Sequence, residues 1–334
     1  MRRALAKLVD GVSLSEAEAR AALDQMVGED LDAALAAAVL TALRVKGETA
    51  DEIRGFALRL RELAVRPPLP DDVGAVDVVG TGGDGADSLN LSTGAALTAA
   101  AAGAPVIKHG ARSVSSRSGS ADVLAALGLA PPPGPSEAGE LFERIGFTFL
   151  FAPAYHPAMK SIAPVRRRLG IRTIFNIAGP LSNPARPPFH VIGAYSAGMA
   201  RTMAETLAGM SIERAYVIHG AAGWDEPTPI GPYTVFETAP GSVTERVEDP
   251  AELGFPRCAP SDLVGGDVAH NARRLRDVFE GERGPHRDAL ILGASLVLRV
   301  RGAEPEEAAA RAAKAIDDGG ALRLVESLKE GRSA

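Results

Sequence analysis

The sequence lacks disulfide-forming cysteines and an excess of positive charge. Among its 334 residues, Cys258 is the only cysteine. No disulfide can therefore form within the chain, and we expect a reducing, cytoplasmic location. The net charge of −6 argues against a protein that binds nucleic acid over a broad basic surface. With 46% hydrophobic and 23% charged residues, the composition is that of a globular protein.

Long apolar segments and several familiar motifs are also missing. The longest apolar run, residues 95–110, is rich in alanine and is interrupted by Gly103 and Pro105, so it cannot span a bilayer. The first 20 residues contain no apolar signal-peptide segment. We therefore expect no membrane partner. No G-x-x-x-x-G-K-[ST] motif occurs, which argues against an ATPase, and no His/Cys cluster has zinc spacing.

The first part of the chain, residues 1–66, is predicted to be a helical domain. Ser15 with Glu18, and Thr49 with Glu52, have the spacing of capping boxes that open helices.

From residue 75 onward, short β-type runs alternate with alanine-rich helical segments. Buried parallel strands are expected at residues 75–79, 104–108, 147–151 and 215–219. An antiparallel pair at one edge is expected at residues 233–238 and 242–247. Residues 157–172 and the tail from Val264 are predicted to be helical. The expected fold class is α/β, a small all-helical domain plus a large α/β domain with a mainly parallel central sheet. The helical domain (1–66) would gain a returning segment near 157–190, and the α/β domain would comprise 72–156 and 191–334.

A glycine-rich stretch, "DVVGTGGDGADSLNLSTG" at residues 77–94, contains a G-x-G-x-x-G pattern. A dinucleotide-binding turn needs a helix at the glycines and an acidic residue about 20 positions later. Here the helix is expected to begin near Ser92, and the later segment "AGAPVIKHG" has no carboxylate. The dinucleotide interpretation is therefore disfavoured. Backbone amides followed by Asn90, Ser92 and Thr93 at a helix start suit a phosphate or diphosphate. A tight turn that binds nothing is the alternative.

A basic loop follows the next expected strand, in "KHGARSVSSRSGSADVLAALG" at residues 108–128. Lys108, Arg112 and Arg117 lie among glycines and serine hydroxyls. Cationic side chains add charge-assisted hydrogen bonds to an anion. Because loops after neighbouring parallel strands share the carboxyl edge of a sheet, the two loops together predict a phosphate-bearing ligand. Read alone, the segment could be a solvated basic loop.

An acidic pair, Asp225 and Glu226, follows the expected strand at 215–219. Adjacent carboxylates are usually surface charge, but near a diphosphate they could hold Mg²⁺ through oxygen atoms, with Ser92 as a further ligand. His109 and His219 are interpreted as loop or supporting groups rather than metal ligands. No residue is assigned as a general base.

Four segments, in this order and spacing, resemble the anthranilate phosphoribosyltransferase family. They are "VGTGGDGADSLNLST", "KHGARSVSSRSGSADVLAALG", "FAPAYHPAMKSIAPVRRRLGIRTIFNIAGPLSNPA" and "HGAAGWDE". The resemblance covers nearly the whole chain. It implies the fold shared with pyrimidine nucleoside phosphorylases and a homodimer formed through the helical domain. It also implies transfer of the phosphoribosyl group of 5-phosphoribosyl-1-diphosphate (PRPP) to the amine of anthranilate, with release of diphosphate, in tryptophan biosynthesis.

The resemblance also implies roles for particular residues. The PRPP site would comprise Gly80, Gly83, Asp84, Ser88, Asn90, Leu91, Ser92, Thr93, Lys108, His109, Gly110, Arg112, Ser115, Ser116 and Ser120. Anthranilate would meet Gly80, Ala111 and Arg166, and Mg²⁺ would meet Ser92, Asp225 and Glu226.

The sequence departs from the family pattern at two places. The family usually reads K-H-G-N-R where Ala111 stands here, and H-G-x-D-G-L-D-E where Ala222 and Trp224 stand here. Loss of the asparagine amide removes a hydrogen bond worth about 0.5–1.5 kcal/mol. A PRPP-dependent transferase with a different aromatic acceptor is therefore an alternative. A nucleoside phosphorylase and a non-catalytic nucleic-acid-binding or regulatory homologue are the others.

Overall fold

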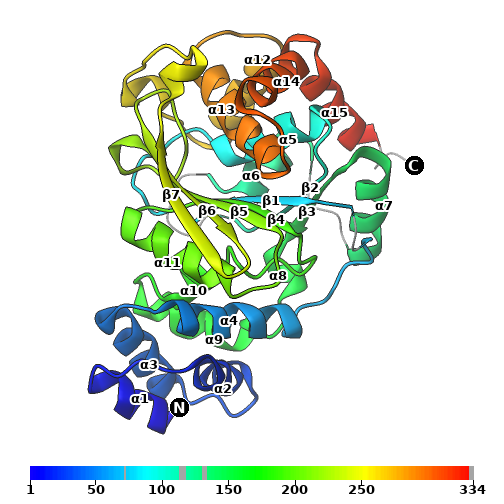
Figure 1. The fold of residues 1–334 in the computed structure, drawn as a ribbon. Helices are drawn as coiled ribbons and strands as arrows, with labels where there is room; N and C mark the ends of the chain where they lie inside the picture. The colour runs from blue at the N-terminus through cyan, green and yellow to red at the C-terminus, as the bar shows by residue number, and fades with distance from the viewer. Residues whose placement is uncertain (71–72, 113–117, 130–133, 331–334) are drawn as a thin grey trace.

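The chain folds into a helical part at one end and an α/β part at the other (Figure 1). The computed structural model describes residues 1–70, 73–112, 118–129 and 134–330. The N-terminus lies in the helical part, and the C-terminal helices lie at the far end of the α/β part. This arrangement confirms the predicted fold class, a helical domain plus an α/β domain with a mainly parallel sheet.

The helical part is built around the first four helices of the chain. They are α1 (Arg2–Val9), α2 (Glu16–Val27), α3 (Ala33–Lys46) and α4 (Ala50–Leu63). Both predicted capping boxes are confirmed, with Ser15 opening α2 and Thr49 opening α4. In each, the hydroxyl accepts from an amide of the first turn, and a glutamate carboxylate accepts from the amide of the capping residue.

Two helices from the middle of the chain return to this helical part. After the short α8 (Ala152–Tyr155) come α9 (Met159–Leu169) and α10 (Ile174–Ala178). Helix α9 packs against α2 and α3, and α10 packs against α4. The Phe56 and Phe175 rings meet edge to face, with centroids 5.5 Å apart, at the α4–α10 contact. Pro164 lies inside α9.

A seven-stranded sheet forms the middle of the α/β part, in the order β3-β2-β1-β4-β5-β6-β7. The strands are β1 (Val76–Gly80), β2 (Val106–Gly110), β3 (Phe147–Phe151), β4 (Phe189–Gly193), β5 (Arg214–His219), β6 (Tyr233–Ala239) and β7 (Ser242–Glu248). The pairs from β3 through β5 are parallel, and β6 and β7 are antiparallel at one edge. The predicted parallel strands and the predicted edge pair are confirmed.

Strand β4 corrects the expectation that residues up to 190 are helical. It begins at Phe189 and pairs with β1 on one side and β5 on the other, at the centre of the sheet. Its five residues, "FHVIG", follow two prolines and are too few to show a period. A short apolar run of this kind cannot be distinguished from a buried helical segment by its pattern alone.

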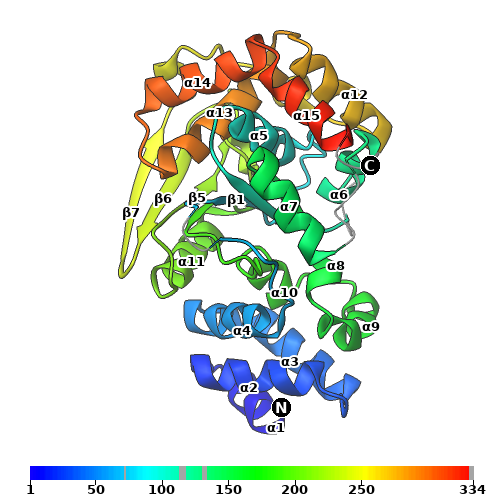
Figure 2. The same cartoon turned by 90° about the vertical axis from the view of Figure 1, so that its right-hand side faces the viewer.

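Helices cover both faces of the sheet (Figures 1 and 2). One face is covered by α5 (Leu91–Ala101), α6 (Ser120–Ala126), α12 (Val268–Phe279), α13 (Pro285–Val300), α14 (Pro305–Asp317) and α15 (Gly320–Glu330). The other is covered by α10, α11 (Ala197–Ala208) and α4, which joins the two parts through a shared apolar core. Helix α7 (Pro135–Ile145) packs against β3. The predicted helical tail is confirmed.

The described residues also contain three 3₁₀ turns. They are η1 (Ala221–Gly223), η2 (Pro250–Leu253) and η3 (Pro260–Leu263). In the described residues, no helix combines the length and the apolar character needed to cross a membrane.

Candidate active site

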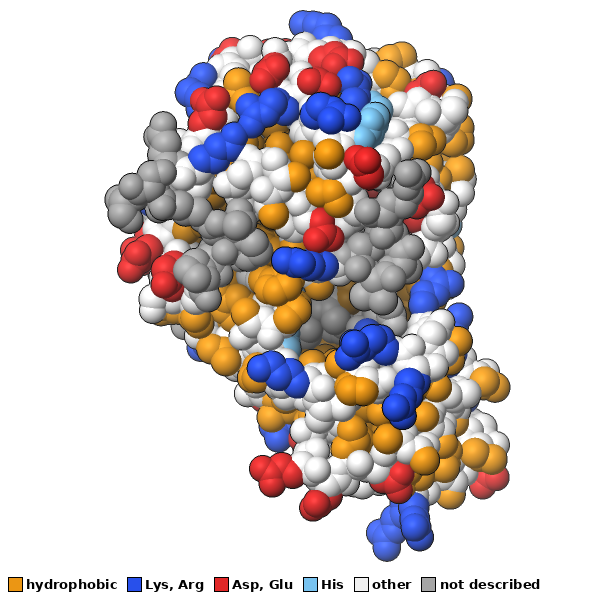
Figure 3. Space-filling model, turned by 180° about the vertical axis from the view of Figure 1, so that it is seen from behind, with side chains coloured by type: hydrophobic (Ala, Val, Ile, Leu, Met, Phe, Trp, Pro, Cys, Tyr) orange, Lys and Arg blue, Asp and Glu red, His pale blue; other side chains and the backbone are white. Residues whose placement is uncertain are grey.

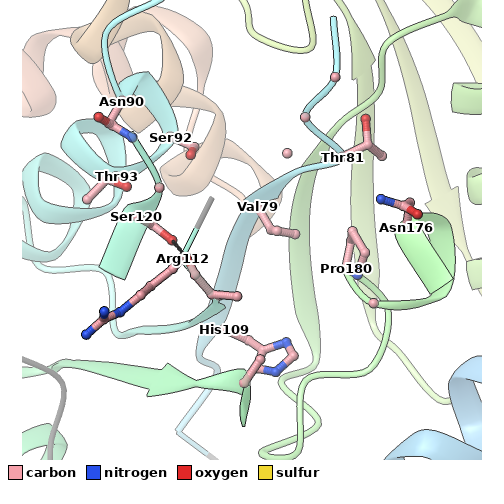
Figure 4. A pocket seen from close by; sticks show the side chains of 18 of the residues that line it. Val79, Thr81, Asn90, Ser92, Thr93, His109, Arg112, Ser120, Asn176 and Pro180 are labelled. Carbon is pink, nitrogen blue, oxygen red and sulfur yellow. Dashed lines mark hydrogen bonds between the residues drawn. The ribbon is translucent and has the colours of Figure 1, made fainter. Parts of the chain in front are cut away.

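A cavity of about 590 Å³ lies where the helical part meets the carboxyl ends of the parallel strands. Figure 3 shows the molecule hollowed between its two parts, with Lys and Arg side chains on both sides of the hollow. In Figure 4, Asn90, Ser92 and Thr93 lie on one side of the cavity and Asn176 and Pro180 on the other. The volume is in the range of sites that take small organic ligands.

The predicted site residues that the structure describes all line this one cavity. They are Gly80, Gly83, Asp84, Ser88, Asn90, Leu91, Ser92, Thr93, Lys108, His109, Gly110, Ala111, Arg112, Ser120, Arg166, Asp225 and Glu226. Ser115 and Ser116 lie outside the described residues. The glycine loop (residues 81–90), the described ends of the basic loop (residues 111–112 and 118–119) and the acidic pair therefore come together, as their positions after parallel strands predict.

The glycine loop is in direct contact with the acidic pair. Gly82 donates from its amide to Oδ2 of Asp225 at 2.7 Å. A Cβ atom at Gly80 would lie 2.6 Å from that same carboxylate oxygen, so a larger residue there would displace the Asp225 carboxylate. Helix α5 begins at Leu91, well after the glycines, as the sequence predicts. The loop is therefore a cradle of backbone amides closed on one side by a carboxylate.

Asn90 ties the glycine loop to the basic loop. Its Nδ2 donates to the Ser118 carbonyl at 3.1 Å, and the Ser118 hydroxyl donates back to its Oδ1 at 3.0 Å. Asn271 of α12 donates to the same Oδ1 at 3.0 Å and also lines the cavity. Sequence reasoning missed Asn271, because a single asparagine in a helical tail carries no signal of a distant partner.

Lys108 is a buried cation beneath the cavity, 2% exposed. Its Nζ donates to the Val78 carbonyl, and it lies 3.4 Å from the Ser92 hydroxyl. Burial lowers the pKa of Lys108, while the carboxylates of Asp77, Glu226 and Asp225 act in the opposite direction. A cation held against α5 in this way can compensate negative charge brought into the cavity.

Three carboxylates, those of Asp84, Asp225 and Glu226, lie close together beside the start of α5. Burial raises the pKa of Asp225 to about 7, and repulsion from Asp84 adds to the rise. Burial also raises the pKa of Glu226 well above its usual value, as does Asp225. Oε1 of Glu226 accepts from the Ser92 amide at 3.0 Å. The positive charge near these three carboxyl groups is too small to stabilise all of them in the ionised form.

The oxygen donors present fit a hard divalent cation that also binds phosphate. Within the described residues, no three or more His, Cys, Asp and Glu side chains are grouped to hold a metal by themselves. Mg²⁺ typically uses one or two carboxylates and completes its shell with water and substrate phosphates. The carboxylates of Asp225 and Glu226, with the Ser92 hydroxyl, match that partial donor set.

Arg166 supplies a cation on the helical side of the cavity. Its guanidinium group stacks over the Phe175 ring, 5.0 Å from the centroid. Burial lowers the pKa of Arg166, and among the described residues no carboxylate offsets this effect. Arg112, on the opposite loop, has a side chain that is 75% exposed and lies 3.7 Å from Asp122. Arg166 is therefore placed to accept a carboxylate from a ligand.

Two histidines that line the cavity are in contact with each other. Nε2 of His109 lies 3.2 Å from Nε2 of His156. Burial lowers the pKa of His156 to about 4 and lowers that of His109 further below its usual value, so both rings are neutral near neutral pH.

Sequence reasoning missed His156 and its neighbours. The missed lining residues on this side include Met159, Lys160, Ala163, Phe175, Asn176, Gly179 and Pro180. Apart from Lys160, they are small, apolar or neutral residues whose types alone indicate no chemistry.

Of the three family departures, Ala111 lies at the cavity, whereas Ala222 and Trp224 are not among its lining residues. Ala111 lines the cavity and is exposed. Trp224 is buried in the apolar core. Ala222 is exposed and has a φ of +58°, a conformation in which aspartate is more common than alanine. None of the three removes a carboxylate or a cation from the cavity.

Two family models match the chain and together cover most of it. Residues 2–64 match the helical bundle domain of a glycosyl transferase family, and residues 72–322 match the α/β domain of that family. The chain is therefore a glycosyl transferase of the two-domain type.

Curated relatives of nearly equal length narrow this class. The anthranilate phosphoribosyltransferases of Desulforudis audaxviator and Rubrobacter xylanophilus are each 45% identical to the chain. The matches cover 99% and 98% of this chain, respectively, and 96% of each relative. The chain belongs to the anthranilate phosphoribosyltransferase family.

Solved structures agree with this membership. Anthranilate phosphoribosyltransferase from Thermus thermophilus is 40% identical, with a TM-score of 0.92 over 99% of both chains. The Saccharomyces cerevisiae enzyme in complex with PRPP and Mg is 27% identical, with a TM-score of 0.87 over 98% of this chain and 96% of that one. The same yeast enzyme has been solved with 4-fluoroanthranilate, with a TM-score of 0.86 and 26% identity over 98% and 96% of the two chains.

The raised pKa of Asp225 predicts how the stability of the metal-free protein depends on pH. The folded protein binds a proton on this carboxyl more tightly than the unfolded chain does. The resulting stability is fully present below about pH 4 and is lost as the pH rises through about 7. In EDTA, the melting temperature of the unmodified protein should fall as the pH is raised from about 5 to about 8. The melting temperature of Asp225→Asn should fall less over the same range.

Thermal melting at both pH values checks this expectation. Asp30→Asn, at an exposed position, serves as the control and should follow the unmodified protein. An equal loss of melting temperature in Asp225→Asn would contradict the prediction.

Proposed function

We propose that the protein transfers the 5-phosphoribosyl group of PRPP to the amine of anthranilate, releasing diphosphate, as a step of tryptophan biosynthesis. One observation carries the proposal. The amide cradle and Lys108, suited to phosphates, share one cavity with the acidic pair and with Arg166, which is paired with no carboxylate in the described part of the chain. This combination suits a diphosphate donor together with a carboxylate-bearing acceptor. Membership of the family supports the same assignment.

The donor would be held mainly by backbone amides and buried cations. The glycine loop and the start of α5 offer amides to phosphate oxygens, and Lys108 adds charge from below. Arg112, largely in solvent, is free to turn toward a bound phosphate. We also assign the hydroxyls of Ser115, Ser116 and Ser120 to this site.

Ser92, Asp225 and Glu226 would hold Mg²⁺. Bound there, Mg²⁺ supplies positive charge that stabilises the departing diphosphate. The protein's own contribution is to place two carboxylates and a hydroxyl at one edge of the phosphate cradle. Because the neighbouring carboxylates repel one another, a cation bound between them would stabilise their ionised forms.

The acceptor would bind between Arg166 and the neutral histidine pair, near Gly80 and Ala111. Arg166 would hold the anthranilate carboxylate and so direct the amine toward C1 of the ribose. The new C–N bond forms as the bond from C1 to the diphosphate oxygen breaks, the electron pair leaves with diphosphate, and the proton that the nitrogen loses passes to the departing diphosphate or to water. An arylamine is already nucleophilic, so no side chain is assigned as a general base.

An acceptor panel tests the proposed function. We expect diphosphate release from PRPP to be fastest with anthranilate, compared with other aromatic amines, and to stop in EDTA. Ala111→Asn should lower the anthranilate KM by up to about tenfold, because it adds one amide hydrogen bond at the rim.

Three outcomes would favour the alternatives instead. Faster turnover of another amine would reassign the acceptor. Phosphorolysis of thymidine or uridine would indicate a nucleoside phosphorylase. Salt-dependent DNA binding without diphosphate release would indicate a regulatory protein.

The role of Arg166 has its own test. Replacing it in Arg166→Ala removes the charge that would meet the acceptor's carboxylate. The anthranilate KM should rise about ten- to a hundredfold, while the KM for PRPP changes little. Steady-state kinetics with each substrate varied would measure both constants. Arg167→Ala, at the exposed neighbour on α9, is the matched control. An unchanged anthranilate KM in Arg166→Ala would remove the assignment.

We further propose a homodimer that forms through the helical part. The exposed apolar side chains Val9 and Val12 lie at the end of α1 and just after it, and Val45 is exposed on α3, which packs against α1. A solution mass of one 34.5 kDa chain by light scattering would contradict the dimer. The cytoplasmic location and the absence of nucleic-acid partners stay predictions.

The division into domains is likewise proposed. Residues 1–66 with the segment near 157–190 would form one domain, and residues 72–156 with 191–334 the other. Strand β4 belongs with the second, although it begins at Phe189.

A further inference from the structure

Arg172 connects the helical part of the chain to the tip of the glycine loop. It lies in the segment between α9 and α10, and its Nη1 donates to the Gly83 carbonyl at 3.2 Å. A Cβ atom at Gly83 would lie only 3.1 Å from the same nitrogen, so the two residues are closely packed. Arg172 is not among the residues that line the cavity. It therefore acts on the loop from outside the cavity.

Tyr195 holds the Arg172 side chain in place. The guanidinium carbon lies 4.0 Å from the centroid of the Tyr195 ring, a close cation–π contact. The Tyr195 amide donates to the Thr81 hydroxyl at 3.3 Å, and the Thr81 amide donates to the Gly193 carbonyl at 2.9 Å. The same tyrosine thus contacts the start of the glycine loop and the arginine that holds its tip. We name this pair of side chains the Arg172–Tyr195 clasp.

The glycine loop needs such external contacts, because its backbone is costly to order. Gly82, Gly83, Gly85 and Asp87 all have positive φ angles. Ordering one residue costs about 1–2 kcal/mol of backbone entropy, and glycine loses the most. At the far end of the loop, Gly265 donates to the Asp87 carbonyl at 2.8 Å. The clasp acts at the tip, where Gly83 turns toward the helical part.

We propose that Arg172 is a positioning residue that orders the glycine loop for the phosphates of the donor. The donor's identity as PRPP rests on the proposed function. The ordering of the loop by the clasp does not. Arg172 lies six residues after Arg166 and four before Asn176, both of which line the acceptor side. The clasp thereby links the segment that would hold the acceptor to the loop that would hold the donor.

Hydrogen exchange on the ligand-free protein tests the clasp without reference to activity. In Arg172→Ala, amides of the peptide covering residues 81–89 should exchange about threefold faster or more. Tyr195→Leu, which keeps apolar bulk but loses the aromatic face, should have the same effect. Arg168→Ala, at an exposed arginine of α9, is the control and should leave this peptide unchanged. Unchanged exchange in both clasp variants would overturn the proposal.

Kinetics and calorimetry then test the consequence for the donor. Arg172→Ala and Tyr195→Leu should each raise the KM for PRPP and its calorimetric Kd by about three- to tenfold, with the anthranilate KM unchanged. The double variant should be no weaker than the worse single one, because both changes break one clasp. Tyr195→Phe keeps the aromatic ring, so its Kd for PRPP should stay near that of the unmodified protein.

The remaining outcomes separate this proposal from the proposed function. An effect on the anthranilate KM alone, or additive effects in the double variant, would overturn the clasp. If the unmodified protein binds PRPP but does not use anthranilate, the proposed function fails and the clasp is still measured by calorimetry. If Arg172→Ala does not fold, Tyr195→Leu and Tyr195→Phe make the same comparison.

Discussion

The site depends on how tightly the acidic segment packs against the ends of three strands. A glycine allows each of these close contacts. A Cβ atom at Gly193, the last residue of β4, would lie 1.6 Å from the Asp225 carbonyl oxygen. One at Gly220, directly after β5, would lie 2.1 Å from the Glu226 carbonyl oxygen. At the end of β1, Gly80 faces the Asp225 carboxylate. Without side chains at these places, the acidic pair can reach the glycine loop.

This close packing explains the electrostatics of the site. Asp225 is 7% exposed, and its pKa rises because burial and the nearby Asp84 carboxylate both disfavour the ionised form of Asp225. The buried Lys108 is the neighbouring cation that opposes the rise for Glu226. A protein that only needed a stable fold would gain from apolar residues here, since buried charge is costly. The cost is explained if the carboxylates bind a ligand. Titratable side chains in clefts whose pKa values are strongly shifted often belong to functional sites.

The sequence predicted the donor side of the site better than the acceptor side, for a physical reason. Loops that follow parallel strands meet at one edge, so Lys108 and Asp225 could be placed together from their positions after strands. Strand β4 escaped detection because five residues after two prolines show no period, yet it is the strand that joins β1 to β5. His156 and Asn271 depend on tertiary packing between distant segments, which no local pattern encodes. The clasp is of the same kind.

The two sides of the cavity also differ in what holds a ligand, and this difference bears on how the protein can vary. The phosphate side is made largely of backbone amides, whose positions depend on glycine conformations and on neighbouring strands. Substitution of an ordinary side chain leaves such a cradle intact. The side proposed for the acceptor is made of side chains from α9, α10 and the described part of the basic loop, and an exchange such as the one at Ala111 would change its hydrogen bonding directly. Acceptor preference can therefore change while use of the phosphate donor is retained. The hydrogen bond from Arg172 to Gly83 connects the segment between α9 and α10, on the side that can vary, to the glycine loop, on the side that is retained.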